Sequence, residues 1–158
     1  VDAYVAYFTT DASDASANDK TAHADDYDKD IWNVGLSYNF APDFVLSGEY
    51  MRGDDDYYNT DKDGWAVDLA WKGATADEPG SYGLHVGYMD QSANAYISPT
   101  TDGFVDADIF KTGYKGMVYG ASYTFAKNIV GVFNYYDFEA KEGGADADTM
   151  FSELYFTF

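Results

Sequence analysis

The ionisable residues that could carry chemistry fall at alternate positions within extended, strand-like segments of the chain. They are Glu49, Asp68, Lys72, His85 and Glu153. Because successive side chains of a strand point to opposite faces, such positions can share one face of a sheet. Carboxylates on a shared face attract cations, and a lysine among them supplies an opposing charge. The sequence therefore predicts a mildly acidic surface that includes one histidine, which we interpret as a polar wall residue.

A stretch that imitates a calcium loop is the nearest approach to a metal motif. The run N-T-D-K-D-G at residues 59–64 reproduces the start of such a loop. Its twelfth position, where a bidentate glutamate is needed, is Ala70. The chain has no cysteine and shows no serine-nucleophile motif, phosphate-binding loop or paired metal ligands. We therefore predict no catalytic residue, no metal site and no cofactor, and we do not expect an enzyme.

Length and charge limit the class of protein. The 158 residues suit one domain, 1–158, and carry a net charge of -19 from 28 acidic and 9 basic residues. This charge disfavours nucleic acid as a partner and favours cations. No apolar run reaches about 18 residues, so no transmembrane helix is predicted. The 16 tyrosines and 11 phenylalanines are harder to explain in a soluble acidic domain than in a protein with aromatic belts.

The hydrophobic pattern predicts eight strands that would position these residues. The predicted strands are residues 3–9, 31–40, 44–52, 64–74, 82–90, 117–126, 129–138 and 150–158. Their connections alternate between long acidic stretches, the last of them 139–149, and short turns with Pro, Gly or Asn. Such a meander places all long loops at one end and all short turns at the other. The fold class predicted is all-β, with antiparallel up-and-down strands.

Aromatic residues bracket an aliphatic middle on one face of several predicted strands. The predicted aromatic girdle consists of Trp32, Phe40, Phe44, Tyr50, Trp65, Trp71, Tyr82, Tyr88 and Phe158. At ~3.3 Å per residue, the bracketing pairs span roughly 20 to 26 Å of strand before tilt. An apolar band about 25 Å tall, with aromatic rings at both interfaces, is typical of an outer-membrane barrel. We therefore predict a transmembrane β-barrel.

Two stretches add a resemblance to a known family. The C-terminal residues 150–158 (MFSELYFTF) alternate and end on an aromatic ring, which resembles the ending of bacterial outer-membrane porins. Residues 71–88 are similar to a strand, turn and strand of the S-layer-homology porins of outer-membrane-bearing Firmicutes. The matching residues are Lys72, Gly73, Ala74, Pro79, Gly80, Ser81 and Gly83. The resemblance implies a bacterial outer-membrane location, contact with lipid and lipopolysaccharide, and homotrimers; members of that family also carry an S-layer-homology domain N-terminal to the barrel.

Two barrel architectures stay open at this point. The resemblance implies a barrel of roughly 16 strands, of which this chain would be the C-terminal half. The alternative is a complete eight-stranded barrel, whose narrow interior side chains must fill. The predicted inner face holds many small residues that would fill such an interior poorly: Gly35, Ser37, Ala66, Ala70, Gly83, Gly87, Gly120 and Ser122. We therefore favour the half-barrel.

Each architecture predicts a function. The half-barrel predicts a porin, a passive channel for small hydrophilic solutes with a mild cation preference set by Glu49, Asp68 and Glu153, with His85 and Lys72 also lining the pore. The complete barrel predicts a structural or adhesive protein whose long acidic loops carry the function. A soluble all-β binding module is a third hypothesis, and it would stay dispersed without detergent.

Overall fold

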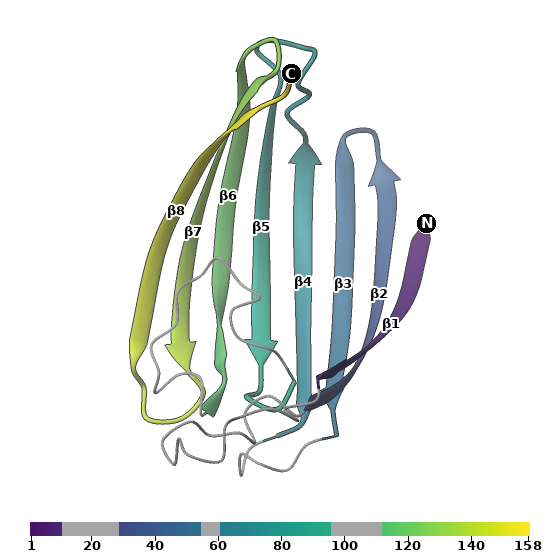
Figure 1. The fold of residues 1–158 in the computed structure, drawn as a ribbon, viewed down its shortest axis with the longest axis vertical. Helices are drawn as coiled ribbons and strands as arrows, with labels where there is room; N and C mark the ends of the chain where they lie inside the picture. The colour runs from purple at the N-terminus through teal and green to yellow at the C-terminus, as the bar shows by residue number, and fades with distance from the viewer. Residues whose placement is uncertain (11–28, 55–60, 96–111) are drawn as a thin grey trace.

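The protein forms one antiparallel sheet of eight strands that follow one another in chain order (Figure 1). The structure is a computed structural model of residues 1–158, and it describes residues 1–10, 29–54, 61–95 and 112–158. The strands are β1 (Asp2–Thr10), β2 (Lys29–Ala41), β3 (Phe44–Gly53), β4 (Asp63–Lys72), β5 (Tyr82–Gln91), β6 (Tyr114–Ala126), β7 (Ile129–Ala140) and β8 (Asp146–Phe156). The predicted up-and-down all-β arrangement is confirmed. Within the described ranges, no helix has the length and hydropathy that crossing a membrane requires.

Strand pairing extends beyond the predicted limits, most clearly between β7 and β8. These strands stay in register as far as the pair Glu139 and Asp146, so most of the predicted loop 139–149 is strand. Gly143 and Gly144 close the turn with φ values of 84° and 64°, which glycine adopts without steric cost. The polarity of this segment concealed a tight hairpin, and the prediction of a long loop was wrong.

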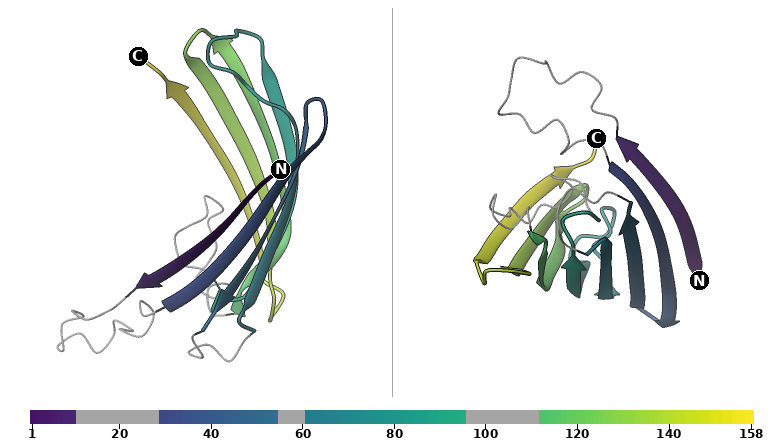
Figure 2. Two further views of the ribbon diagram at one scale, coloured as in Figure 1. Left: turned by 90° about the vertical axis from the view of Figure 1, so that its right-hand side faces the viewer. Right: turned by 90° about the horizontal axis from the view of Figure 1, so that it is seen from below.

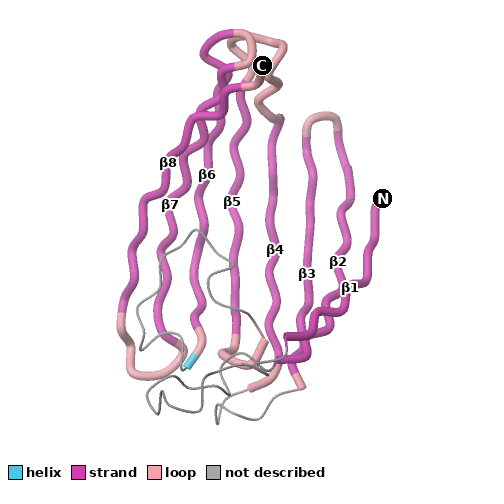
Figure 3. Tube along the Cα trace, in the orientation of Figure 1, coloured by secondary structure: helices cyan, strands magenta, loops and turns pink. Residues whose placement is uncertain are grey.

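The connections separate by the end of the sheet at which they lie (Figures 1 and 3). The short-turn end carries the connections 42–43, 73–81 and 127–128. The opposite end, which we call the long-connection end, carries the turn 141–145 and the strand ends that flank 11–28, 55–60 and 96–111. The three connections predicted to be short therefore lie at one end, as expected, whereas the short hairpin turn 141–145 lies at the other end, against the prediction.

The sheet is curved and open. Its edge strands β1 and β8 curl toward the same side (Figure 2). Each edge strand pairs with a single neighbour, β1 with β2 and β8 with β7. The described strands therefore form a trough with a concave and a convex face rather than a closed barrel.

The two faces differ in composition, as β2 illustrates. Trp32, Val34 and Leu36 on the convex face are 51%, 48% and 53% exposed, whereas the alternate residues Ile31 and Gly35 are buried. Directly paired residues of neighbouring strands lie on the same face, so the register carries this division across the sheet. The convex face is aromatic and aliphatic, and the concave face is rich in small and polar residues.

A small apolar core lies on the concave face of β6 and β7. Its buried members are Tyr114, Val118, Tyr136, Phe138 and Ala140 of β6 and β7. The Phe138 ring centroid lies 4.8 Å from that of Tyr114 and 5.5 Å from that of Tyr136, distances at which aromatic rings attract. This core fixes β6 and β7 next to the polar residues described below.

Candidate functional site: the hollow of the concave face

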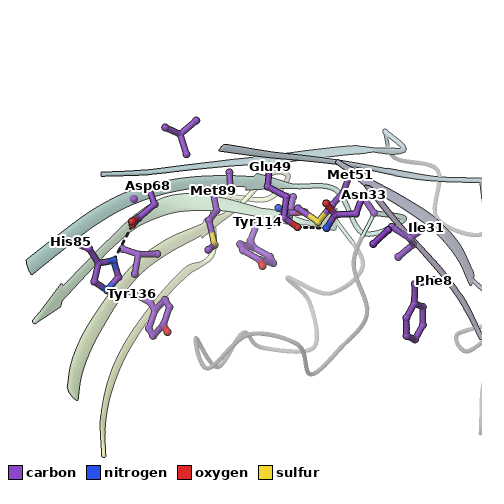
Figure 4. A pocket seen from close by; sticks show the side chains of 17 residues that line it. Phe8, Ile31, Asn33, Glu49, Met51, Asp68, His85, Met89, Tyr114 and Tyr136 are labelled. Carbon is purple, nitrogen blue, oxygen red and sulfur yellow. Dashed lines mark hydrogen bonds and ion pairs between the residues drawn. The ribbon is translucent and has the colours of Figure 1, made fainter. Parts of the chain in front are cut away.

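The concave face encloses a hollow of about 610 Å³ that is lined by residues of β1 to β7 (Figure 4). Glu49, Asp68 and His85 lie on its wall, with the apolar side chains of Met89 and Phe8 nearby. The sequence predicted that the two carboxylates and the histidine share a face, and the structure places them in one hollow. Their role as pore-lining residues stays a prediction.

His85 connects strands that are not neighbours. Its Nδ1 lies 2.9 Å from Oδ2 of Asp68 in β4, and its Nε2 lies 3.1 Å from Oδ1 of Asn134 in β7. The strand between β5 and β7 is β6, whose residue at this position is Gly120. A Cβ atom at Gly120 would overlap the His85 ring. The absence of a side chain at this one position therefore lets the imidazole reach across β6.

A second group of polar residues, around Glu49, also depends on a glycine in the intervening strand. The Glu49 carboxylate accepts a hydrogen bond from Nδ2 of Asn33 in the neighbouring strand β2. Gly35 of β2 pairs with Tyr4 on one side and with Glu49 on the other. A Cβ atom at Gly35 would overlap the Tyr4 ring. The glycine therefore allows Tyr4 to lie across β2 toward Glu49.

Residues 92–95, which we call the β5 stem, turn back over the concave face at the long-connection end. The stem is 0–1% exposed, and the Ser92 hydroxyl donates a hydrogen bond of 2.7 Å to the carbonyl oxygen of Asp63. A Cβ atom at Gly53 of β3 would overlap the backbone carbonyl of Asn94. The stem narrows the hollow, and sequence analysis missed it because the segment after residue 90 has no apolar period.

No lysine or arginine of the described residues lines the hollow. Several described lysines and arginines form ion pairs with other acidic residues, namely Arg52 with Asp63 at 3.0 Å, Lys115 with Glu139 at 3.1 Å, Lys127 with Asp77 at 3.7 Å and Lys141 with Asp90 at 2.6 Å. The acidic character of the wall is therefore not offset by a neighbouring lysine or arginine among these residues.

Lys72 and Glu153 lie outside the hollow. β4 ends at Lys72, whose φ of 59° interrupts the alternation of the strand. Its Nζ lies 5.1 Å from the Trp71 ring centroid and 4.7 Å from that of Tyr82, which are convex-face residues. The predicted inward direction of Lys72 therefore does not hold, because the positive φ redirects the side chain and the ammonium group then makes cation–π contacts with these rings. Glu153 keeps the register of the concave face, and its carboxylate accepts a hydrogen bond from the Tyr155 hydroxyl.

The predicted girdle residues lie in two groups on the convex face. At the short-turn end, the successive ring centroids of Phe40, Phe44, Trp71 and Tyr82 are 5.7, 6.3 and 5.6 Å apart. Toward the long-connection end lie Trp32, Tyr50, Trp65 and Tyr88, with the last two ring centroids 5.3 Å apart. Phe158 follows the end of β8 and is exposed. Aliphatic residues occupy the strands between the two groups.

Three amides of the site escaped the sequence analysis. Asn33, Gln91 and Asn134 all interact with or adjoin the acidic wall. Alternation places Asn33 on the inner face, but its partner depends on the exact register of β2 and β3. Asn134 is three strands away from Asp68 in the sheet, and only the glycine at position 120 brings the two to the same imidazole. The signal that could have revealed this contact is a glycine on the inner face of one strand, paired on either side with a polar inner-face residue of the neighbouring strands.

No protein-family model matches the chain, and no curated protein matches it in sequence.

Proposed function

We propose that this chain forms part of the wall of a bacterial outer-membrane porin, through which small hydrophilic solutes diffuse with a mild preference for cations. The observation that carries the proposal is the division of one curved up-and-down sheet into an apolar, aromatic-banded convex face and a polar concave face. In a membrane barrel, lipid covers the outer face of the strands and water fills the inside.

The exposure of apolar side chains on the convex face supports the proposal that this face contacts lipid. Its side chains are exposed on every strand from β2 to β8, and they include Leu36, Leu84 and Leu154 at 53%, 47% and 57%. Soluble monomers rarely expose a contiguous apolar patch larger than a few hundred Å². Hydrocarbon would bury the aliphatic middle, and the two aromatic groups would lie among lipid and lipopolysaccharide head groups at the interfaces.

The open edges support the half-barrel. Backbone groups along the free edges of β1 and β8 lack ladder partners, which is costly within a bilayer. Strands from the rest of a larger barrel would satisfy both edges and close the trough around a wide, water-filled interior. The porins that the sequence resembles have barrels of roughly 16 strands and form trimers, and we extend both properties to this protein as part of the proposal.

The charges of the hollow support cation preference. Glu49 and Asp68 lie on the wall, and no described lysine or arginine joins them. Rings of acidic side chains favour cations in a pore. The preference should be mild because the channel is wide and salt screens its charges.

Single-channel recording tests the proposal directly. The natively purified protein should give nanosiemens-scale steps in planar bilayers, and its reversal potential in a salt gradient should indicate cation preference. Glu49→Gln should reduce that preference, whereas Glu142→Gln, which removes the same charge from an exposed turn, should change it less. Silent bilayers or an anion preference in the unmodified protein would contradict the proposal.

One observation favours the second candidate, a sealed structural or adhesive barrel. The apolar core of β6 and β7 and the buried β5 stem occupy part of the concave side, as the filling of a narrow barrel would. Intact mass measured on the sample used for recording separates the candidates. A mass of 17.5 kDa with no conductance indicates the sealed barrel, and a mass near twice that with conductance indicates the porin.

A further inference from the structure

His85 is a titratable group in a hollow whose other charges are carboxylates. Histidine is the side chain whose unperturbed charge change falls between about pH 5 and 8. Within the part of the chain that the structure describes, the acidic residues that line the hollow are Glu49 and Asp68, and no lysine or arginine joins them. The charge of this part of the wall around neutral pH therefore depends on the protonation of His85.

Two small residues leave room for the contact between His85 and Asp68 (Figure 4). The two side chains are diagonal neighbours, because the residues directly opposite them in the register are Ala70 and Gly87. A Cβ atom at Gly87 would lie 2.9 Å from Oδ2 of Asp68, the oxygen that contacts the imidazole, which is too close for an unstrained contact. The side chains of His85 and Asp68 are 34% and 36% exposed. Protons and dissolved ions can therefore reach both groups from the hollow.

Asn134 can form a hydrogen bond with either protonation state of the imidazole. In the structure, Nδ1 faces the Asp68 carboxylate and Nε2 faces Oδ1 of Asn134, so both ring nitrogens face acceptors, as the imidazolium requires. When Nε2 loses its proton it becomes an acceptor, and rotation of the Asn134 amide then presents its NH₂ group in place of the oxygen. Nδ1 keeps its proton and its contact with Asp68. His85 can therefore change charge without movement of a strand.

The other ionisable side chains of this face are carboxylic acids and phenols. Carboxylic acids ordinarily titrate near about pH 4 and phenols near about pH 10, so a charge change centred near neutral pH distinguishes an imidazole from both classes. Among the described residues, the register places the following ionisable groups on the concave face of the strands around His85: Asp68 of β4, Glu49 of β3, Tyr114 of β6, Tyr136 of β7 and Glu153 of β8.

From this arrangement, we propose that His85 is a selectivity-determining residue of the channel, whose protonation sets how strongly the wall prefers cations. Beside a neutral imidazole, Asp68 contributes its full negative charge to the hollow, whereas an imidazolium 2.9 Å away cancels that charge. Protonation of His85 therefore halves the formal negative charge that Glu49 and Asp68 give to this wall. Acidic side chains attract cations into a pore, so the cation preference falls as the pH falls. The inference rests on the proposed porin function, because it names the residue that regulates its selectivity.

Reversal potentials of the native protein in a KCl gradient, recorded from about pH 5 to about pH 9, test the inference. The permeability ratio of K⁺ over Cl⁻ should move toward one as the pH falls through the neutral range. His85→Gln should lose this change and keep the higher ratio, because no cation then cancels Asp68. Asp68→Asn should keep the change at a lower ratio throughout, because the imidazolium then adds an unpaired positive charge. The matched control is His23→Gln, which replaces the second histidine of the chain, outside the described residues, and should behave as the unmodified protein does.

A proton NMR titration in detergent separates this inference from channel function. The His85 ring signal, identified by its loss in His85→Gln, should titrate within the same pH range. A ring that does not titrate there would overturn the inference, as would a pH dependence of the permeability ratio that survives in His85→Gln. A conducting protein whose ratio does not change with pH keeps the porin and loses the role of His85. A silent protein loses the porin, and the NMR titration then decides separately whether the charge of the Asp68 and His85 pair depends on pH.

Discussion

Replacement of Gly120 by alanine is the most direct test of how much the contacts of His85 stabilise the protein. The new Cβ atom would overlap the His85 ring and lie 2.5 Å from Asn134 Oδ1, so the imidazole must leave its place between Asp68 and Asn134. Two hydrogen-bonding contacts, of 2.9 and 3.1 Å, are then lost. At about 0.5 to 1.5 kcal/mol each, and near the lower end because these side chains are partly exposed, the loss amounts to about 1 to 2 kcal/mol.

Gly48 supplies the matched control for this experiment. It lies in the middle of β3, and a Cβ atom there would meet its nearest neighbour at 3.7 Å, an ordinary contact distance. Gly48→Ala should stabilise the protein by about 0.4 to 1 kcal/mol by restricting the unfolded chain. In urea unfolding from detergent or lipid, Gly120→Ala should therefore be less stable than the unmodified protein, and Gly48→Ala should be more stable.

A double-mutant cycle with His85→Ala tests whether displacement of the imidazole causes the destabilisation by Gly120→Ala. Without the imidazole, the methyl group of Gly120→Ala has no ring to displace, so its penalty should largely disappear. Equal destabilisation by Gly120→Ala in both backgrounds would refute the reasoning, because the cost would then arise from the backbone rather than from the polar wall. A Gly120→Ala variant as stable as Gly48→Ala would refute it as well.

The remaining predictions address the faces and the ends of the sheet. Leu36→Arg should destabilise the protein in liposomes by about 2 to 4 kcal/mol if its face meets lipid, whereas the neighbouring Ser37→Arg should not; equal effects in unfolding titrations would contradict this assignment. Lys72→Gln should leave the reversal potential unchanged, because the ammonium group lies against aromatic rings; a clear rise in cation preference would show that it faces the channel. Gly53→Val should displace the β5 stem and make it sensitive to limited proteolysis, and unchanged protection would show that the stem is held by other contacts.

The sequence predicted most of each strand because apolar and polar residues alternate there. In β2, the alternate residues from Trp32 to Phe40 that share a face in the sequence are all exposed, whereas Ile31 and Gly35 on the other face are buried. The period of two is a local property, and it fixes the face of every residue once a strand forms. The hairpin between β7 and β8 was missed because its residues are polar on both faces, and polarity alone does not separate an exposed strand from a loop.

The site was harder to predict because its contacts cross several strands. Glu49, Asp68 and His85 were recognised as inner-face residues from alternation alone. Their partners Asn33 and Asn134 depend on the register between strands, which local patterns specify only weakly. Lys72 departs from the alternation because its positive φ redirects the side chain, and no neighbouring residue type signals such a value for a lysine.

The glycines of the concave face link stability to function. The buried apolar core of the concave face lies on β6 and β7. Elsewhere, cross-strand polar contacts must hold the wall, and they reach across a strand only where that strand has no side chain, as at Gly35 and Gly120. In the porin that we propose, the same missing side chains would also widen the interior. Small inner-face residues would then serve two purposes at once, since they allow polar contacts between distant strands and leave space through which a solute can pass.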